Sequence, residues 1–188
     1  MRKVWIIISL AFIVVLFINF NGLLLPSRST GNTIEEAIQK SGRNVTRIIH
    51  TEEVKDGVVV FYKKSIGNAE ESNASGYVKK TLWGWVWAWG GEHSDSASKG
   101  FSAQYFPYAE DAPFPLAFGE IKDQQIKQIE VMDNNRTNDK EAKIIGKGKD
   151  LMWFSFLDKS EGPNFTIIGL SEEGTTLYSE TIHTEGSR

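Results

Sequence analysis

The most chemically capable side chains in this sequence stand together as Glu92, His93, Ser94 and Asp95. In a catalytic interpretation, His93 acts as a general base, while Glu92 or Asp95 orients it or supplies a proton. Neighbouring residues in a turn point in different directions, and Ser and Asp after a strand are ordinary turn residues. The pattern therefore favours turn chemistry over an active site, and no catalytic residue is predicted.

A row of tryptophans at every second position precedes this cluster. Strict alternation in a strand would place all four indoles on one face, roughly 6.6 to 7 Å apart, as a stacking platform for sugar rings. The alternative is that the row is the core face of a sheet. The core interpretation is favoured, because four exposed indoles would form an apolar patch that soluble domains avoid. Solvent and ligand contact are expected mainly at Trp89, and the candidate binding residues are Trp83, Trp85, Trp87, Trp89, Glu92 and His93.

No metal, cofactor or nucleic acid is predicted to bind. The chain has three histidines and no cysteine, so zinc-ligand spacings such as H-E-x-x-H do not occur, and His50 and His183 stand alone in strand-like segments. The glycine motifs of phosphate and dinucleotide sites are missing, as is a G-x-S-x-G nucleophile elbow. With 21 Lys and Arg against 24 Asp and Glu, the chain lacks the positive field of a nucleic-acid surface.

The elements that must position these residues are predicted to be mainly strands. Thr33 and Glu36 form a T-x-x-E capping box, which predicts the start of a helix. Two β-branched and aromatic runs joined by an Asp56-Gly57 turn then predict a hairpin. A polar loop over 67–75 is expected to lead into the tryptophan strand. Residues 33–93 are therefore expected to form a lobe in which one short helix packs on an antiparallel sheet.

The second half of the chain is predicted to be all-β. Residues 94–115 carry scattered Ser, Gly and Pro among five aromatics, which predicts a long, packed, aromatic-rich connection. Residues 116–182 show short strand patterns separated by turn clusters, at the spacing of a small sandwich or barrel. The predicted fold is mainly β, of the α+β class, with a β-sandwich- or barrel-like C-terminal lobe.

The N-terminal part of the chain is an apolar run over residues 4–25. As a helix rising 1.5 Å per residue, its 22 positions would span about 33 Å, enough to cross a hydrocarbon core of roughly 30 Å. Arg2 and Lys3 precede the run, so the positive-inside bias places the N-terminus in the cytoplasm. The sequence therefore predicts a single-pass transmembrane helix with the rest of the chain outside.

A cleaved signal peptide is the alternative, because it also begins with positive charge and an apolar core. Retention is favoured, since the run exceeds the typical core of roughly 7 to 15 residues and no A-x-A cleavage pattern follows it. Both alternatives deliver the domain outside the cytoplasm. The expected organisation is an anchor over 1–25, a linker over 26–32 and an extracytoplasmic domain over 33–188.

Two groups of residues carry a resemblance to known proteins. The first comprises Val59-Val60-Phe61-Tyr62, the run Ser75–Trp85 and Gly90-Gly91. The second comprises Phe118-Gly119-Glu120-Ile121, Trp153-Phe154, Ile168-Gly169 and Glu173-Gly174. Together they resemble segments of uncharacterised small, single-span or secreted envelope proteins of Bacillus-type bacteria. The resemblance implies a compartment and a shared fold over most of the exported part, and it implies no activity.

These observations predict a membrane-anchored, extracytoplasmic binding or interaction module of the bacterial cell envelope, without catalysis. Its expected partner is an envelope protein or cell-wall glycan, in addition to the membrane itself. The first alternative is carbohydrate binding through the row from Trp83 to Trp89. A third hypothesis is an envelope glycan hydrolase, in which Glu92 and Asp95 would form the pair of carboxylates that glycosidases need.

Overall fold

The computed structural model describes residues 29–66, 70–92, 100–107, 114–133, 139–158 and 164–183. Within these ranges the chain forms one short α-helix, a 3-10 turn and strands arranged in three antiparallel sheets. The predicted mainly β fold is thus confirmed. The predicted transmembrane helix over 1–25 lies outside the described residues, and no helix among the described residues is long and apolar enough to span a membrane.

The first sheet is a meander in the order β1-β2-β3-β4. Its strands are β1 (Val45–Val54), β2 (Gly57–Ile66), β3 (Glu70–Thr81) and β4 (Gly84–Glu92). Asp56 takes a left-handed conformation, with φ of 63°, in the predicted turn between β1 and β2. The polar loop expected over 67–75 is wrong from residue 70 onward, because Asn73 and Ser75 are buried and pair with β2.

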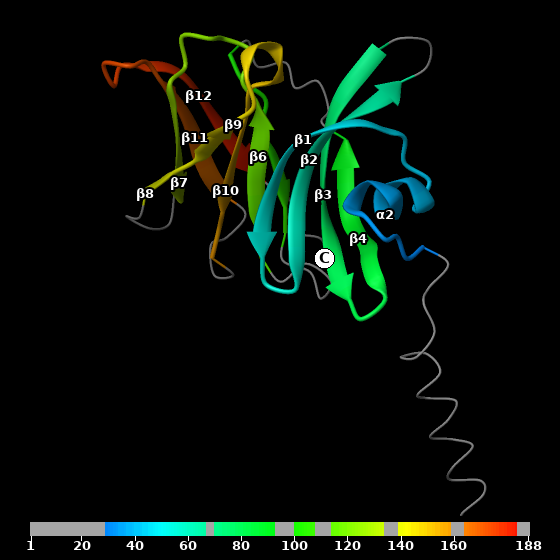
Figure 1. Ribbon diagram of the computed structural model, residues 1–188. Helices are drawn as coiled ribbons and strands as arrows, with labels where there is room; N and C mark the ends of the chain where they lie inside the picture. Colours follow the sequence, from blue (N-terminus) through cyan, green and yellow to red (C-terminus); the bar gives the residue numbers. More distant parts are fainter. Residues whose placement is uncertain are drawn as a thin grey trace, which may run out of the picture.

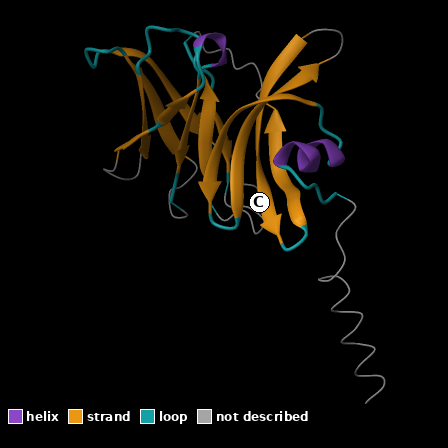
Figure 2. Ribbon diagram, viewed as in Figure 1, coloured by secondary structure: helices purple, strands orange, loops and turns teal. Residues whose placement is uncertain are grey.

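Helix α2 (Ile34–Lys40) begins at the predicted capping box and packs on one face of the first sheet. The Glu36 amide donates to Thr33 Oγ1 at 3.1 Å, and the Glu36 carboxylate accepts from the amide of Asn32 at 2.7 Å. Ala37 and Ile38 are fully buried against this face, which we call the helix face. The helix lies over β4 at the right of the molecule (Figures 1 and 2).

The other two sheets each contain four strands. The middle sheet has the order β5-β6-β10-β9, with β5 (Gln104–Phe106), β6 (Leu116–Glu120), β10 (Met152–Phe156) and β9 (Lys143–Ile145). The third sheet has the order β12-β11-β7-β8, with β12 (Thr176–His183), β11 (Asn164–Leu170), β7 (Gln128–Asp133) and β8 (Asp139–Glu141). Strand β5 therefore lies inside the stretch expected to be a connection.

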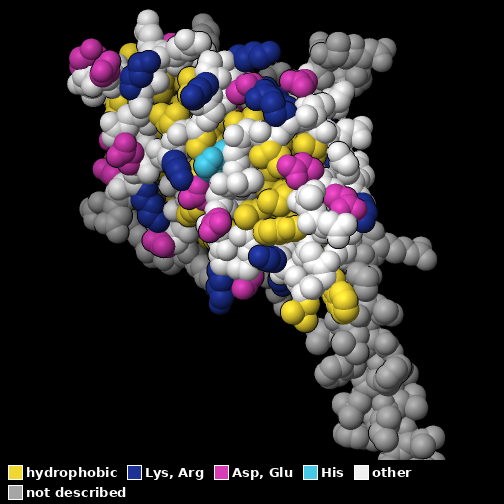
Figure 3. Space-filling view, viewed as in Figure 1, with side chains coloured by type: hydrophobic (Ala, Val, Ile, Leu, Met, Phe, Trp, Pro, Cys, Tyr) yellow, Lys and Arg dark blue, Asp and Glu magenta, His cyan; other side chains and the backbone are white. Residues whose placement is uncertain are grey.

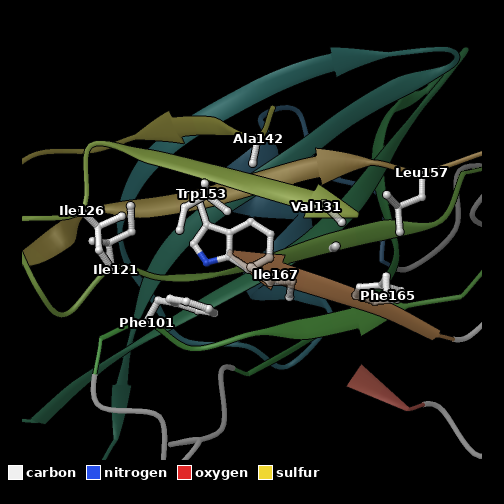
Figure 4. Packing of buried hydrophobic residues seen from close by; sticks show 11 residues of the cluster. Phe101, Ile121, Ile126, Val131, Ala142, Trp153, Leu157, Phe165 and Ile167 are labelled. Atoms are coloured by element: carbon white, nitrogen blue, oxygen red, sulfur yellow. The ribbon is translucent and has the colours of Figure 1, made fainter. Parts of the chain in front are cut away.

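The middle sheet is covered on both faces. Phe118 and Phe154 lie in a core shared with the inner face of the first sheet, where Val59 and Phe61 are buried. The alternate residues of β6 and β10, such as Trp153, lie in a second core shared with the third sheet (Figure 4). Successive residues of a strand point to opposite faces of the sheet. The largely apolar sequences of β6 and β10 are therefore typical of strands that are buried on both faces.

One extended segment joins the third sheet to the middle sheet. It pairs with β7 through β8, passes Ala142, and then pairs with β10 through β9. The amide of Ala142 donates to the carbonyl of Ile129 at 2.8 Å, so the segment stays bonded as it changes sheets. The segment over 139–145 therefore belongs to both sheets.

Candidate functional site

A β-bulge divides the predicted row of tryptophans. Trp87 pairs with Val78, but Trp89 pairs with Tyr77, so Ala88 is an extra residue in β4. Trp85 and Trp87 therefore pack on the helix face, whereas Trp89 packs on the opposite face. The prediction that all four indoles share one face is wrong, because a bulge shifts the alternation by one residue.

Trp87 is packed closely within the helix face. Its ring meets Tyr62 edge-on at 6.1 Å, and the Arg43 guanidinium lies 4.4 Å from its centroid. A Cβ added at Gly76 or Gly90 would collide with the indole. Both glycines thus supply the space in which the ring lies, and its contacts are those of a partly buried core residue rather than of an open platform.

Trp89 lies between the first sheet and the middle sheet. Its ring contacts Phe106 at 4.5 Å between centroids and Tyr77 at 6.3 Å. Its buried indole N–H has no acceptor among the described residues. The expectation that Trp89 is the tryptophan most open to solvent is therefore wrong, because the bulge turns it into the inter-sheet core.

Trp83 lies outside β4, at the tip of the two-residue turn between β3 and β4. It is 47% exposed, and its neighbour Leu82 is 91% exposed. Thr81 orders the turn, since its hydroxyl accepts from the amide of Trp83 and donates to the carbonyl of Gly84. We call Leu82 and Trp83 the hairpin tip.

A groove of about 290 Å³ opens on the first sheet near this turn. Trp85 forms one wall, and the Lys80 ammonium lies 5.5 Å from the centre of its ring. The carboxylates of Glu53 and Asp56 lie at the rim, and both residues are exposed. Neither carboxylate has an ion-pair or hydrogen-bond partner among the described residues. The groove thus presents an aromatic wall, two available carboxylates and an ammonium group.

A second concavity, of about 390 Å³, lies against Phe154 and Phe156 in the middle sheet. Two of its charged groups bind each other: Lys143 pairs with Glu52 at 2.6 Å, and Glu52 also contacts the neighbouring His50 at 2.9 Å. Burial raises the pKa of Glu52, but these hydrogen bonds outweigh it, so that the pKa lies below its ordinary value. The cluster joins β1 to β9, which gives it a structural role.

A further ion-pair cluster joins the first sheet to the middle sheet. Asp150, in the 3-10 turn Gly148–Asp150, contacts Arg47 at 2.7 Å and Lys63 at 3.4 Å. The hydrogen bond from Arg47 holds the pKa of Asp150 below its ordinary value, and Lys63 acts in the same direction against the opposing effect of burial. Lys63 is only 8% exposed, so Asp150 compensates a buried charge.

The remaining predicted site residues are not brought together. The backbone of Glu92 pairs with Ala74, but its side chain, His93 and Asp95 lie outside the description of the structure. His50 belongs to the Glu52 cluster, while His183 ends β12. Among the described residues, no three acidic or histidine side chains are placed to hold a metal ion.

The groove was missed in the sequence because its walls come from two separate turns. In a four-stranded meander the first and third turns must lie at the same end of the sheet. The Asp56 turn and the Trp83 turn therefore meet, and the lining residues Glu53 and Lys80 lie just before them. Comparisons of the chain with protein-family models, with curated proteins and with solved structures found no match.

Proposed function

We propose that this chain is a membrane-anchored, extracytoplasmic binding module of a bacterial envelope, and that the groove beside Trp85 is its ligand site. The observation that carries the proposal is the set of charged side chains around an aromatic wall: two carboxylates without an ion-pair partner among the described residues, and the Lys80 ammonium. Elsewhere on the same sheets, carboxylates such as Glu52 and Asp150 are used in ion pairs. The carboxylates of Glu53 and Asp56 remain available to a ligand.

The start of the domain determines how far it would lie from a membrane that holds the proposed anchor. Gly31 and Trp85 exchange two backbone hydrogen bonds of 2.8 Å each. The last part of the predicted linker over 26–32 is thus bonded to the edge of the first sheet. Five residues separate Gly31 from the end of the apolar run at Leu25. The domain would therefore lie close to the membrane that holds the run.

Carbohydrate binding is the second candidate, and Trp85 is the observation that favours it. Sugar rings stack on indole faces, while carboxylates accept hydrogen bonds from their hydroxyl groups. Trp85 is partly exposed and borders the groove together with Glu53 and Asp56. Trp85 is the one indole among the lining residues of the groove, so the contact would be a single stack instead of the extended row. The hydrolase hypothesis gains no support, since the side chains of Glu92 and Asp95 are not described.

The topology can be tested in intact cells that express the full chain with a C-terminal epitope. We expect the protein to fractionate with membranes and the epitope to be removed by protease added outside. A cytoplasmic protein of the same cells serves as the control and must stay intact. Soluble full-length protein, or a protected epitope, would contradict the proposed topology.

The groove can be tested with the double variant Glu53→Gln, Asp56→Asn, which keeps the shape of both side chains. We expect the full-length variant in detergent to lose at least fivefold in affinity for purified cell-wall sacculi. The matched control is Glu172→Gln, Glu173→Gln in the exposed turn between β11 and β12. Equal affinity of the two double variants would reject the groove as the ligand site.

A further inference from the structure

We propose that the hairpin tip inserts into the outer interface of the membrane that holds residues 4–25, so that the domain contacts the bilayer at two points. This inference rests on the anchor proposed above. It starts from the exposure of the tip, because Leu82 is 91% and Trp83 is 47% exposed, whereas the other large apolar side chains among the described residues are better covered. The proposed occupant of this apolar tip is the lipid surface.

The start of the domain lies directly beside the tip. The carbonyl of Gly31 occupies the space that a Cβ on Gly84 would need, and the Thr30 side chain lies close to the same position. Gly84 also has φ of 128°, a region that favours glycine. Gly84 immediately follows Trp83, so the tether joins the domain at the base of the turn.

The tether is too short to hold the domain far from the membrane. Six Cα–Cα steps join Leu25 to Gly31, and a fully extended chain covers at most about 21 Å in six steps. The headgroup region on each side of a bilayer is several ångströms thick, being the difference between about 30 Å of hydrocarbon and about 40 to 45 Å in total. A turn beside Gly31 is therefore within reach of the interface.

The composition of this end of the first sheet fits an interface. Tryptophan is enriched at the headgroup level, where its ring is buried and its N–H stays hydrated. The carboxylates of Glu53 and Asp56 also lie at this end, and they are outnumbered by three exposed lysines, Lys55 in the first turn and Lys79 and Lys80 at the end of β3. The lysines are placed to meet anionic headgroups. Figure 3 shows hydrophobic side chains at the lower right of the described surface, with Lys or Arg side chains nearby.

The test uses a single fluorescent label in the full chain, which contains no cysteine of its own. Leu82→Cys and the control Glu172→Cys are labelled with an environment-sensitive dye. Each protein is reconstituted in vesicles of phosphatidylethanolamine and phosphatidylglycerol, with nitroxide quenchers near the headgroups. We expect strong quenching and a blue-shifted emission at position 82, with neither effect at position 172. Adding Trp83→Ser to Leu82→Cys should reduce the quenching at least twofold.

The outcomes separate this inference from the anchor. If the protein floats with the vesicles but the label at position 82 is not quenched, the tip proposal is overturned and the anchor stands. If the protein does not float, the anchor is overturned and the tip proposal falls with it. Equal quenching at positions 82 and 172 also rejects the tip, because the domain would then lie on the membrane without a preferred contact.

Discussion

Trp83 and Trp89 are six positions apart in the sequence and occupy opposite kinds of environment. Trp89 lies between two sheets, so Trp89→Ala should remove core contacts and cost about 3 kcal/mol in the free energy of unfolding. Trp83→Ala, at the exposed tip, should change it by about 0.5 kcal/mol or less. Urea unfolding of the two variants measures both changes.

Trp89→Phe is the matched control for this comparison. It keeps a ring between the sheets and removes the buried N–H that has no acceptor among the described residues. An unpaired buried donor is costly, so the loss should be much smaller than for Trp89→Ala. A larger loss for Trp83→Ala than for Trp89→Ala would contradict the placement of both indoles.

Asp150 should make stability depend on pH. Its pKa is lowered in the folded state, mainly by the hydrogen bond from Arg47. A lowered carboxyl pKa stabilises the fold above the unfolded value, near 4, and this contribution disappears as the pH falls through the folded value. At pH 7 the melting temperature of Asp150→Asn should therefore be lower than that of the wild type. The difference in melting temperature should narrow below about pH 4.

Thermal melting at several pH values between 7 and 3 measures this gap. Asp139→Asn, in the exposed part of β8, is the control and should follow the wild type throughout. A gap for Asp150→Asn that stays constant down to pH 3 would mean that the carboxylate does not stabilise the fold through its charge.

In strand β4, one extra residue, Ala88, determines the faces of the sheet on which Trp87 and Trp89 lie. Deleting Ala88 should leave a regular strand in which Trp87 still faces the helix and Trp89 still faces the middle sheet. Deleting Val86 instead should move Trp87 to the opposite face and leave a small residue in its place. We expect the first variant to unfold cooperatively with a modest loss of stability, and the second to lose its cooperative transition.

Circular dichroism during heating measures the unfolding transition of both variants. Each deletion removes one residue from the same strand, so each variant is the control for the other. Similar losses of stability for both would show that the length of β4 matters and its alternation does not.

The sequence predicted elements best where neighbouring residues determine them. The capping box at Thr33 and the turn at Asp56 act through local hydrogen bonds and backbone preference, and the structure has both. The bulge at Ala88 depends on how β4 pairs with β3, which alternation within one strand does not encode. The groove could not be predicted for a similar reason. Glu53 meets Trp85 only because of the order of the strands in the sheet, which the local sequence does not encode.

At the scale of the whole molecule, the middle sheet links two cores. Strands β6 and β10 are interior to this sheet and buried on both faces. Their amides can exchange only when both cores open, so they should show the slowest hydrogen exchange in the domain. Mass spectrometry of peptides covering 116–120 and 152–156 tests this, with the edge strand β1 as the faster reference. Faster exchange in β6 than in β1 would contradict a shared central layer.

The position of the middle sheet also has a consequence for biogenesis. The first sheet is complete in the chain at residue 92, but β10, which covers its inner face, ends about 60 residues later. At roughly 5 to 20 residues per second, synthesis of that stretch takes about 3 to 12 seconds. During this time Val59 and Phe61 lack the layer that buries them in the finished domain. A nascent chain would then offer a holding chaperone an apolar sheet face, which disappears once the last strand of the middle layer has emerged.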